Sequence, residues 1–190
     1  MTPPHNFSWD GDGNGQEYQC NAVLATSREL DFALLRIAPL AGAGPVRPAR
    51  LVASGSSTTN RDNLRLIHHM ACLPKQLSDR CTVLRTPAPG WIAESGDVRL
   101  YHDCGSNPGS SGAPLFDREG AVAALHHQGR DLDQQTCKPI DNVNKAIRIQ
   151  AILKSLCAAN PALGARLDPT ECRLSFPPAE PEHNRVNQQP

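Results

Sequence analysis

Apolar and polar residues alternate in short runs over much of the chain, and clusters of turn-forming residues separate the runs. A period of two residues is typical of half-buried strands, in which successive side chains point to opposite faces. Residues 98–102 show this alternation, whereas the turn Asp-Arg-Glu-Gly at 117–120 separates two short apolar runs. Many short strands with regular turns indicate an all-β barrel. The pattern predicts strands at residues 18–26, 31–37, 64–70, 81–86, 98–102, 113–116 and 121–126.

The period changes towards the C-terminus. Apolar residues there follow the i, i+3, i+4, i+7, i+8 spacing of one helix face, at Ile149, Ile152, Leu153, Leu156 and Cys157. We therefore expect a helix over 144–159, capped by Asn142 or Asn144 and stopped by Pro161. Beyond this point prolines are frequent and large apolar residues are few, so 161–190 is predicted to be a disordered tail.

Residues 38–61 show neither period and are rich in Pro, Gly, Ala, Ser and Thr. We interpret this stretch, and 46–61 in particular, as a linker between residues 1–45 and residues 62–160. A chain of 190 residues is long enough for one domain or for two small barrels that share a core.

Charge and hydropathy narrow the classes of partner. Lys+Arg and Asp+Glu both number 19, so no net field draws the chain to nucleic acid or to an acidic membrane. No apolar run approaches the length of a membrane span. The first residues, Met-Thr-Pro-Pro, lack the basic region and apolar stretch of a signal peptide.

Candidate chemistry gathers at residues 103–116, where Ser111 stands among small residues. A serine hydroxyl attacks a carbonyl only with a base beside it and backbone N–H groups aimed at the developing oxyanion. Gly109 allows torsions that turn successive N–H groups into one hollow, and Gly112 leaves room for a substrate chain. The run Gly-x-Ser-Gly-x-Pro thus indicates a nucleophile with its oxyanion hole. The alternative is an ordinary Gly/Ser/Pro loop between strands.

Three segments, "PGSSGAPLFD", "AVAALHHQG" and "NKAIRIQAIL", resemble the chymotrypsin-like (trypsin-like) serine peptidases, in particular their bacterial glutamyl-endopeptidase branch. The resemblance covers roughly residues 7–158. It implies an all-β double barrel with a C-terminal helix, in which 1–45 is the remainder of the N-terminal barrel and 62–160 is the C-terminal barrel. It also implies a peptide or protein substrate, no cofactor, a monomer, and a secreted or periplasmic location.

The resemblance assigns roles by position. Ser111 matches the nucleophile, and the amides of Gly109 and Ser111 match the oxyanion hole. The run "DFALL" is similar to the family's strand that opens with the catalytic aspartate, which implies that Asp31 orients the base. The alternative for Asp31 is an exposed carboxylate at a strand edge.

The base is the difficulty. His5 is the only histidine before Asp31, no predicted strand precedes it, and residues 7–10 resemble the segment directly after the family's histidine. We therefore expect the chain to lack the N-terminal part that holds the catalytic histidine, His5 to be a mobile terminal residue, and peptidase activity to be low. The second hypothesis is accordingly a truncated or degenerate homologue that at most binds peptides.

The substrate pocket is predicted from Gly105, Ser106 and His126. Basic-specific relatives carry an aspartate at the position that Gly105 matches, so no charge here selects Lys or Arg. Glutamate-preferring relatives resemble the chain in a small hydroxyl residue at Ser106 and a histidine at His126. Both groups can donate to a carboxylate, which implies a preference for acidic residues before the cleaved bond. The alternative is that His126 and His127 are simply polar residues at a strand end.

Seven cysteines leave at least one unpaired. Disulfides such as Cys72–Cys81 or Cys104–Cys137 are the simplest interpretation, and family members place a bridge where the second would lie. Zinc is the weaker alternative, because His69 and Cys72 have a ligand spacing but no second pair comes after them. The acidic-glycine run at 10–15 lacks the last glutamate and the flanking helices of a calcium loop, and we interpret it as a hairpin loop. No metal is expected.

Overall fold

The computed structural model describes residues 5–6, 16–44, 46–52, 63–85, 98–130, 135–136, 138 and 143–175. The acidic-glycine run at 10–15 lies outside these residues. The chain divides into two compact units, residues 1–152 and residues 153–190, and each is described by itself. In the described part of the chain, no helix is long and apolar enough to cross a membrane.

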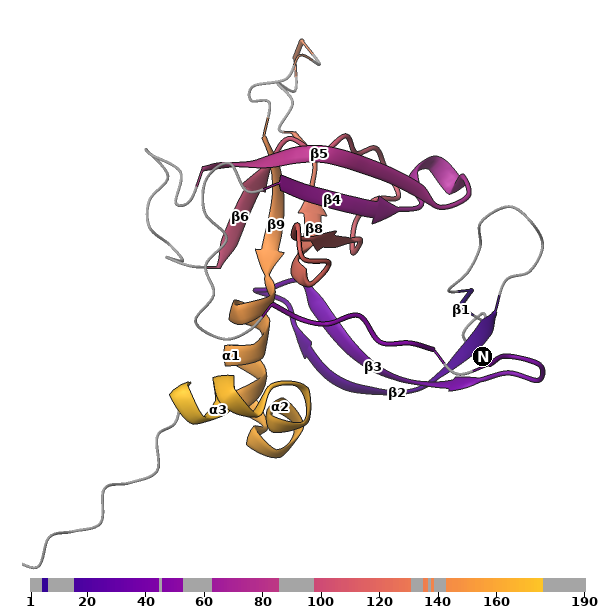
Figure 1. Ribbon diagram of the computed structural model, residues 1–190, viewed down its shortest axis with the longest axis vertical. Helices are drawn as coiled ribbons and strands as arrows, with labels where there is room; N and C mark the ends of the chain where they lie inside the picture. The colour runs from indigo at the N-terminus through magenta and orange to yellow at the C-terminus, as the bar shows by residue number, and fades with distance from the viewer. Residues whose placement is uncertain are drawn as a thin grey trace, which may run out of the picture. The chain divides into compact units, whose positions relative to one another are not determined.

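The first unit begins with an antiparallel three-stranded sheet in the order β1-β2-β3 (Figure 1). Its strands are β1 (His5–Asn6), β2 (Glu17–Ser27) and β3 (Phe32–Pro39), which confirms both strands predicted here. The backbone of His5 pairs with that of Tyr18 in β2. The backbone of His5 therefore lies in a strand, and the expectation of a mobile terminal residue is wrong for this backbone.

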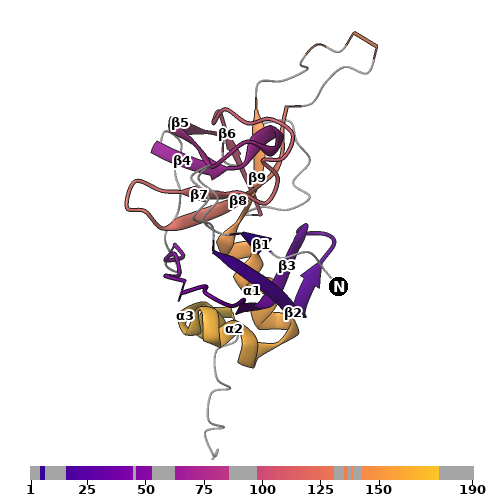
Figure 2. The same ribbon diagram turned by 90° about the vertical axis from the view of Figure 1, so that its right-hand side faces the viewer.

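The rest of the first unit is a closed six-stranded barrel in the order β4-β5-β6-β9-β8-β7 (Figures 1 and 2). Closure comes from pairing of β7 with β4, which leaves no free edge. Alternate residues point inward and form the core, among them Leu64, Leu66, Val83, Leu100 and Leu115. The predicted all-β class is confirmed. The strands are β4 (Asn63–His68), β5 (Gln76–Arg85), β6 (Arg99–His102), β7 (Pro114–Phe116), β8 (Val122–Gln128) and β9 (Asn144–Arg148), and a short 3-10 helix η1 (Met70–Cys72) comes after β4.

The predicted helix starts later than expected. Residues Asn144–Arg148 form β9 between β6 and β8, and α1 begins only at Ile149 and ends at Ala159. Asn144 is therefore a strand residue and not a helix cap. All five residues of β9 are buried, so the strand lacks the alternation by which sequence reveals a half-exposed strand.

The predicted disordered tail is wrong for residues 161–175. They form α2 (Pro161–Leu167) and α3 (Pro169–Ser175), and a Cys157–Cys172 disulfide links α3 to α1. Pro161 opens α2, where its missing N–H costs nothing, and the Asn160 side chain accepts a hydrogen bond from the Leu163 amide. Residues 176–190 lie outside the described part.

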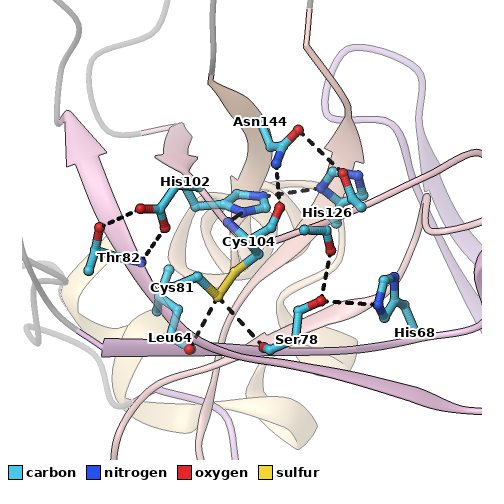
Figure 3. Close-up of a disulfide and its surroundings, with 12 residues drawn as sticks. Leu64, His68, Ser78, Cys81, Thr82, His102, Cys104, His126 and Asn144 are labelled. Carbon is cyan, nitrogen blue, oxygen red and sulfur yellow. Dashed lines mark hydrogen bonds between the residues drawn. A yellow bond between two sulfur atoms is a disulfide. The ribbon is translucent and has the colours of Figure 1, made fainter.

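The second disulfide joins Cys81 and Cys104 inside the barrel (Figure 3). Val83 and His102 are register partners in the antiparallel β5–β6 pair, so Cys81 and Cys104 face each other two residues further along. Both pairings suggested from the sequence, Cys72–Cys81 and Cys104–Cys137, are therefore wrong. Among the cysteines whose side chains are described, Cys20 is free.

Candidate active site

The nucleophile loop, residues 103–113, connects β6 to β7 and separates two adjacent serines. Ser111 is exposed, whereas Ser110 is fully buried. Gly109 has φ +97°, and a Cβ there would lie 2.9 Å from the backbone oxygen of His69, so only glycine fits. Gly112 has φ +84°, again in the left-handed region. The two glycines bend the chain so that Ser111 alone presents its hydroxyl to solvent.

In the turn 109–112, two of the four backbone amides have no protein acceptor among the described residues. The Ser110 amide donates to the Asn107 carbonyl over 3.0 Å, and the Gly112 amide donates to the His126 carbonyl over 2.7 Å. Within the described residues, the amides of Gly109 and Ser111 donate to no protein acceptor. Two unpaired N–H groups beside an exposed serine hydroxyl are what an oxyanion of acyl transfer requires.

Ser111 and Asp31, the two predicted catalytic residues, both contact His127. The Ser111 Oγ lies 3.5 Å from the backbone oxygen of His127, and the Asp31 Oδ2 lies 2.7 Å from His127 Nδ1. Asp31 stands in the turn before β3 with φ 46°, and its side chain is 65% exposed rather than buried. Among the histidines whose side chains the structure describes, none has an imidazole nitrogen that is a hydrogen-bond partner of Ser111 Oγ.

The predicted pocket residues lie around the end of β6. The Ser106 hydroxyl donates to Asn144 Oδ1 over 3.3 Å, and the Asn144 side-chain amide donates to the Cys104 carbonyl. Gly105 is exposed, and its carbonyl accepts from the Ser78 hydroxyl over 2.8 Å. The strand register brings Asn144 opposite His102, which links this group to the histidines of the barrel interior.

His126 is buried in the barrel and contacts a second buried histidine, His102 (Figure 3). The Cys104 amide donates to His102 Nδ1 over 3.2 Å, so that nitrogen carries no proton. The other nitrogen, His102 Nε2, then donates to His126 Nδ1, 3.1 Å away. The proton of neutral His126 therefore sits on Nε2, the nitrogen left to donate to a ligand.

Burial keeps both imidazoles neutral. Burial, and to a smaller degree the charge of His126, lowers the pKa of His102 to about 3. Burial, followed by the charges of His68 and His127, lowers the pKa of His126 to about 4. A third buried imidazole, His68 of β4, contacts Ser110 of the nucleophile loop. Neither His102 nor His68 was predicted from sequence. The usable signal was the inward register of alternate strand residues, which places both side chains inside the barrel.

The described residues contain no group of three or more His, Cys, Asp or Glu side chains that could hold a metal ion. The disulfide between Cys81 and Cys104 leaves neither sulfur as a free thiol that could bind a metal.

Known proteins show the same fold. The chain is similar to the crystal structure of the Rv3671c protease in its inactive form, with a TM-score of 0.54 and 13% sequence identity over 78% of this chain and 69% of that chain. A comparison with curated protein sequences finds no match. A model of the trypsin-like peptidase domain matches residues 3–125, well over half of the sequence. The chain therefore belongs to the trypsin-like peptidase domain family.

Proposed function

We propose that this chain carries the site of a serine endopeptidase, in which Ser111 is the nucleophile. The observation that carries the proposal is the exposed Ser111 hydroxyl beside the unpaired amides of Gly109 and Ser111. In the proposed reaction Ser111 Oγ attacks the peptide carbonyl, and the two amides hold the oxyanion. The leaving amine takes the proton lost by Ser111, and water then hydrolyses the acyl-enzyme.

Asp31 has the proposed role of orienting the base that takes the Ser111 proton. Two histidines are candidates for this base. The imidazole of His127 already binds the Asp31 carboxylate. His5 lies in β1 and pairs with Tyr18 at the start of β2, whereas the turn that carries Asp31 follows the opposite end of β2 at Ser27, so His127 is the better candidate. Alanine substitution of each histidine separately, with turnover as the measurement, identifies which of them serves.

The proposed specificity is for acidic residues before the cleaved bond. Gly105 supplies no carboxylate for a basic side chain, while the Ser106 hydroxyl and the protonated Nε2 of neutral His126 are hydrogen-bond donors. A bound carboxylate would accept from His126 Nε2, and from the Ser106 hydroxyl once this hydroxyl turns from Asn144 Oδ1 to the ligand. Its charge would favour protonation of the pair formed by His126 and His102. Cleavage of a peptide library, with Ser111→Ala as the blank, tests this. Dominant cleavage after Lys or Arg contradicts it.

A second candidate function, peptide binding without cleavage, has its own supporting observation. The Asp31 carboxylate is occupied by His127, and Ser111 Oγ contacts a carbonyl oxygen rather than an imidazole. Casein and peptide hydrolysis by the folded 190-residue chain separates the two functions. Turnover lost in Ser111→Ala supports the enzyme. Saturable peptide binding with no turnover above that of Ser111→Ala supports the binding module.

A further inference from the structure

The best-formed serine–histidine contact in the described residues does not involve the proposed nucleophile. His68 Nδ1 lies 2.7 Å from the hydroxyl of Ser110, and both residues are almost fully buried, with 2% and 0% of their surfaces exposed. We propose that His68 is a positioning residue that fixes the nucleophile loop, so that Ser111 and the amides beside it keep their geometry. The inference rests on the proposed role of Ser111.

The hydrogen bonds around His68 are consistent with one assignment of donors and acceptors. The Ser78 hydroxyl donates to the Gly105 carbonyl over 2.8 Å, so its oxygen is left to accept from His68 Nε2, 3.4 Å away (Figure 3). His68 Nδ1 is then unprotonated and accepts the Ser110 hydroxyl proton.

The Ser110 oxygen, in turn, accepts from the Asn107 amide over 3.2 Å. Neutral His68 with its proton on Nε2 gives every donor and acceptor in this series of hydrogen bonds a partner. Burial, and to a smaller degree the charge of neighbouring His69, lowers the pKa of His68 and favours this neutral form. Protonated His68 would carry a second proton on Nδ1, which would face the Ser110 hydroxyl proton, and the order would fail at that contact.

The imidazole joins two parts of the loop that serve different purposes. Through Ser110 it reaches the centre of the nucleophile turn, and through Ser78 it reaches Gly105 at the predicted pocket. The segment after β4 adds a backbone contact, because the Ala71 amide donates to the Pro108 carbonyl over 2.8 Å. The strand end at His68 and η1 thus form the surface on which the loop folds, and Gly109 packs directly against it.

The alternative is a histidine that merely fills the core. The two roles differ in how substitutions combine. If His68 acts through Ser110, removing either partner disturbs the loop in the same way, and removing both adds little. If His68 only fills space, the effects of the two substitutions multiply.

The experiment compares His68→Ala, His68→Asn, Ser110→Ala and the double variant His68→Ala/Ser110→Ala, with His69→Asn as the matched control on the adjacent histidine. Two quantities are measured in each folded variant: hydrogen exchange of the amides in 105–112, and the rate at which an activated fluorophosphonate labels Ser111, followed by mass over hours. The thermal unfolding midpoint of each variant is recorded beside them.

We expect His68→Ala and Ser110→Ala each to slow labelling about 10- to 100-fold, with faster exchange in 105–112 and no further loss in the double variant. His68→Asn should recover part of the rate, because its Oδ1 can accept from Ser110 as Nδ1 does. His69→Asn should stay within about twofold of the wild type. Unchanged exchange in His68→Ala, or multiplying effects in the double variant, would overturn the inference.

A failure of the proposed function can be distinguished from a failure of the inference about His68. If the wild-type chain is not labelled at Ser111, the proposed activity fails, because either the nucleophile is another residue or no base serves Ser111, and exchange alone then decides the role of His68. Faster exchange in His68→Ala but not in His69→Asn still supports the inference, and equal exchange in the two variants overturns it. If His68→Ala does not fold, exchange and labelling are compared in Ser110→Ala and His68→Asn instead.

Discussion

The imidazole of His127 donates a hydrogen bond to the carboxylate of Asp31, with 2.7 Å between Nδ1 and Oδ2 and 96 positions between them in the sequence. The backbone oxygen of the same histidine lies 3.5 Å from Ser111 Oγ. One residue of β8 therefore contacts both proposed catalytic groups. Since His127 is next to His126, the same end of β8 contributes residues to the proposed catalytic group and to the proposed pocket.

Substitution of the two adjacent serines should separate them by function. Ser111 is exposed between two glycines in the left-handed region, whereas the Ser110 hydroxyl is buried against His68. Where a base serves Ser111, we expect an activated fluorophosphonate to add one label, at a peptide containing Ser111, and Ser111→Ala to abolish it. Ser110→Ala should still be labelled, more slowly. Labelling that persists in Ser111→Ala and disappears in Ser110→Ala would reverse the assignment.

Peptidase turnover by the 190-residue chain is expected to be low. Among the histidine side chains that the structure describes, none is a hydrogen-bond partner of Ser111 Oγ. Loss of the histidine lowers turnover of such a triad by about a millionfold, equivalent to about 8 kcal/mol of barrier. Casein and short esters serve as substrates, beside Ser111→Ala as the blank. High turnover that His5→Ala or His127→Ala abolishes would contradict this prediction and name the base.

The fold was predictable where the sequence carries a local signal. The barrel strand β4 begins with alternating polar and apolar residues, and the structure buries Leu64 and Leu66 as that alternation predicts. β9 carries no such signal, because it is buried on both faces and runs directly into α1. The disulfide Cys81–Cys104 also escaped prediction, since it depends on the register of β5 with β6 and not on spacing along the chain.

The candidate site divides in the same way. The glycines around Ser111 act through the backbone of their own loop, so the local pattern was sufficient to select the loop. His127 reaches Asp31, and His68 reaches Ser110, only after distant segments have folded together. The partner of a histidine at a strand end depends on the folded structure and cannot be identified from neighbouring residues in the sequence. Sequence therefore indicated the proposed nucleophile but not the residues that contact or support it.

Acid should destabilise the barrel through its buried histidines. In the folded chain burial lowers the pKa of His102 to about 3 and that of His126 to about 4, whereas the unfolded chain binds these protons near pH 6.5. The stabilisation is complete above pH 6.5 and is lost as the pH falls towards 4, because only the unfolded state takes up protons in that window. Each unit of pKa difference corresponds to about 1.4 kcal/mol, so the free energy of unfolding should fall by several kcal/mol.

Urea unfolding between pH 4 and pH 7 measures this dependence. His102→Gln removes one imidazole of the buried pair and should flatten the slope, while Cys20→Ala, which removes no imidazole, should leave the slope unchanged. A slope that is identical in wild type and His102→Gln would show that these histidines do not govern the acid response.

The Cys81–Cys104 disulfide should stabilise the barrel independently of the site chemistry. It closes a loop with a sequence separation of 23, for which the chain-entropy argument gives about 3 kcal/mol. We expect Cys81→Ala/Cys104→Ala to lower the free energy of unfolding by about that amount, and a reductant to have little further effect at this bridge. Cys20→Ala is the matched control, because Cys20 is free among the described cysteines. Urea unfolding at pH 7 provides the measurement. Equal midpoints for the double variant and Cys20→Ala would show that the bridge contributes nothing, since both sulfurs lie in the core that the midpoint reports.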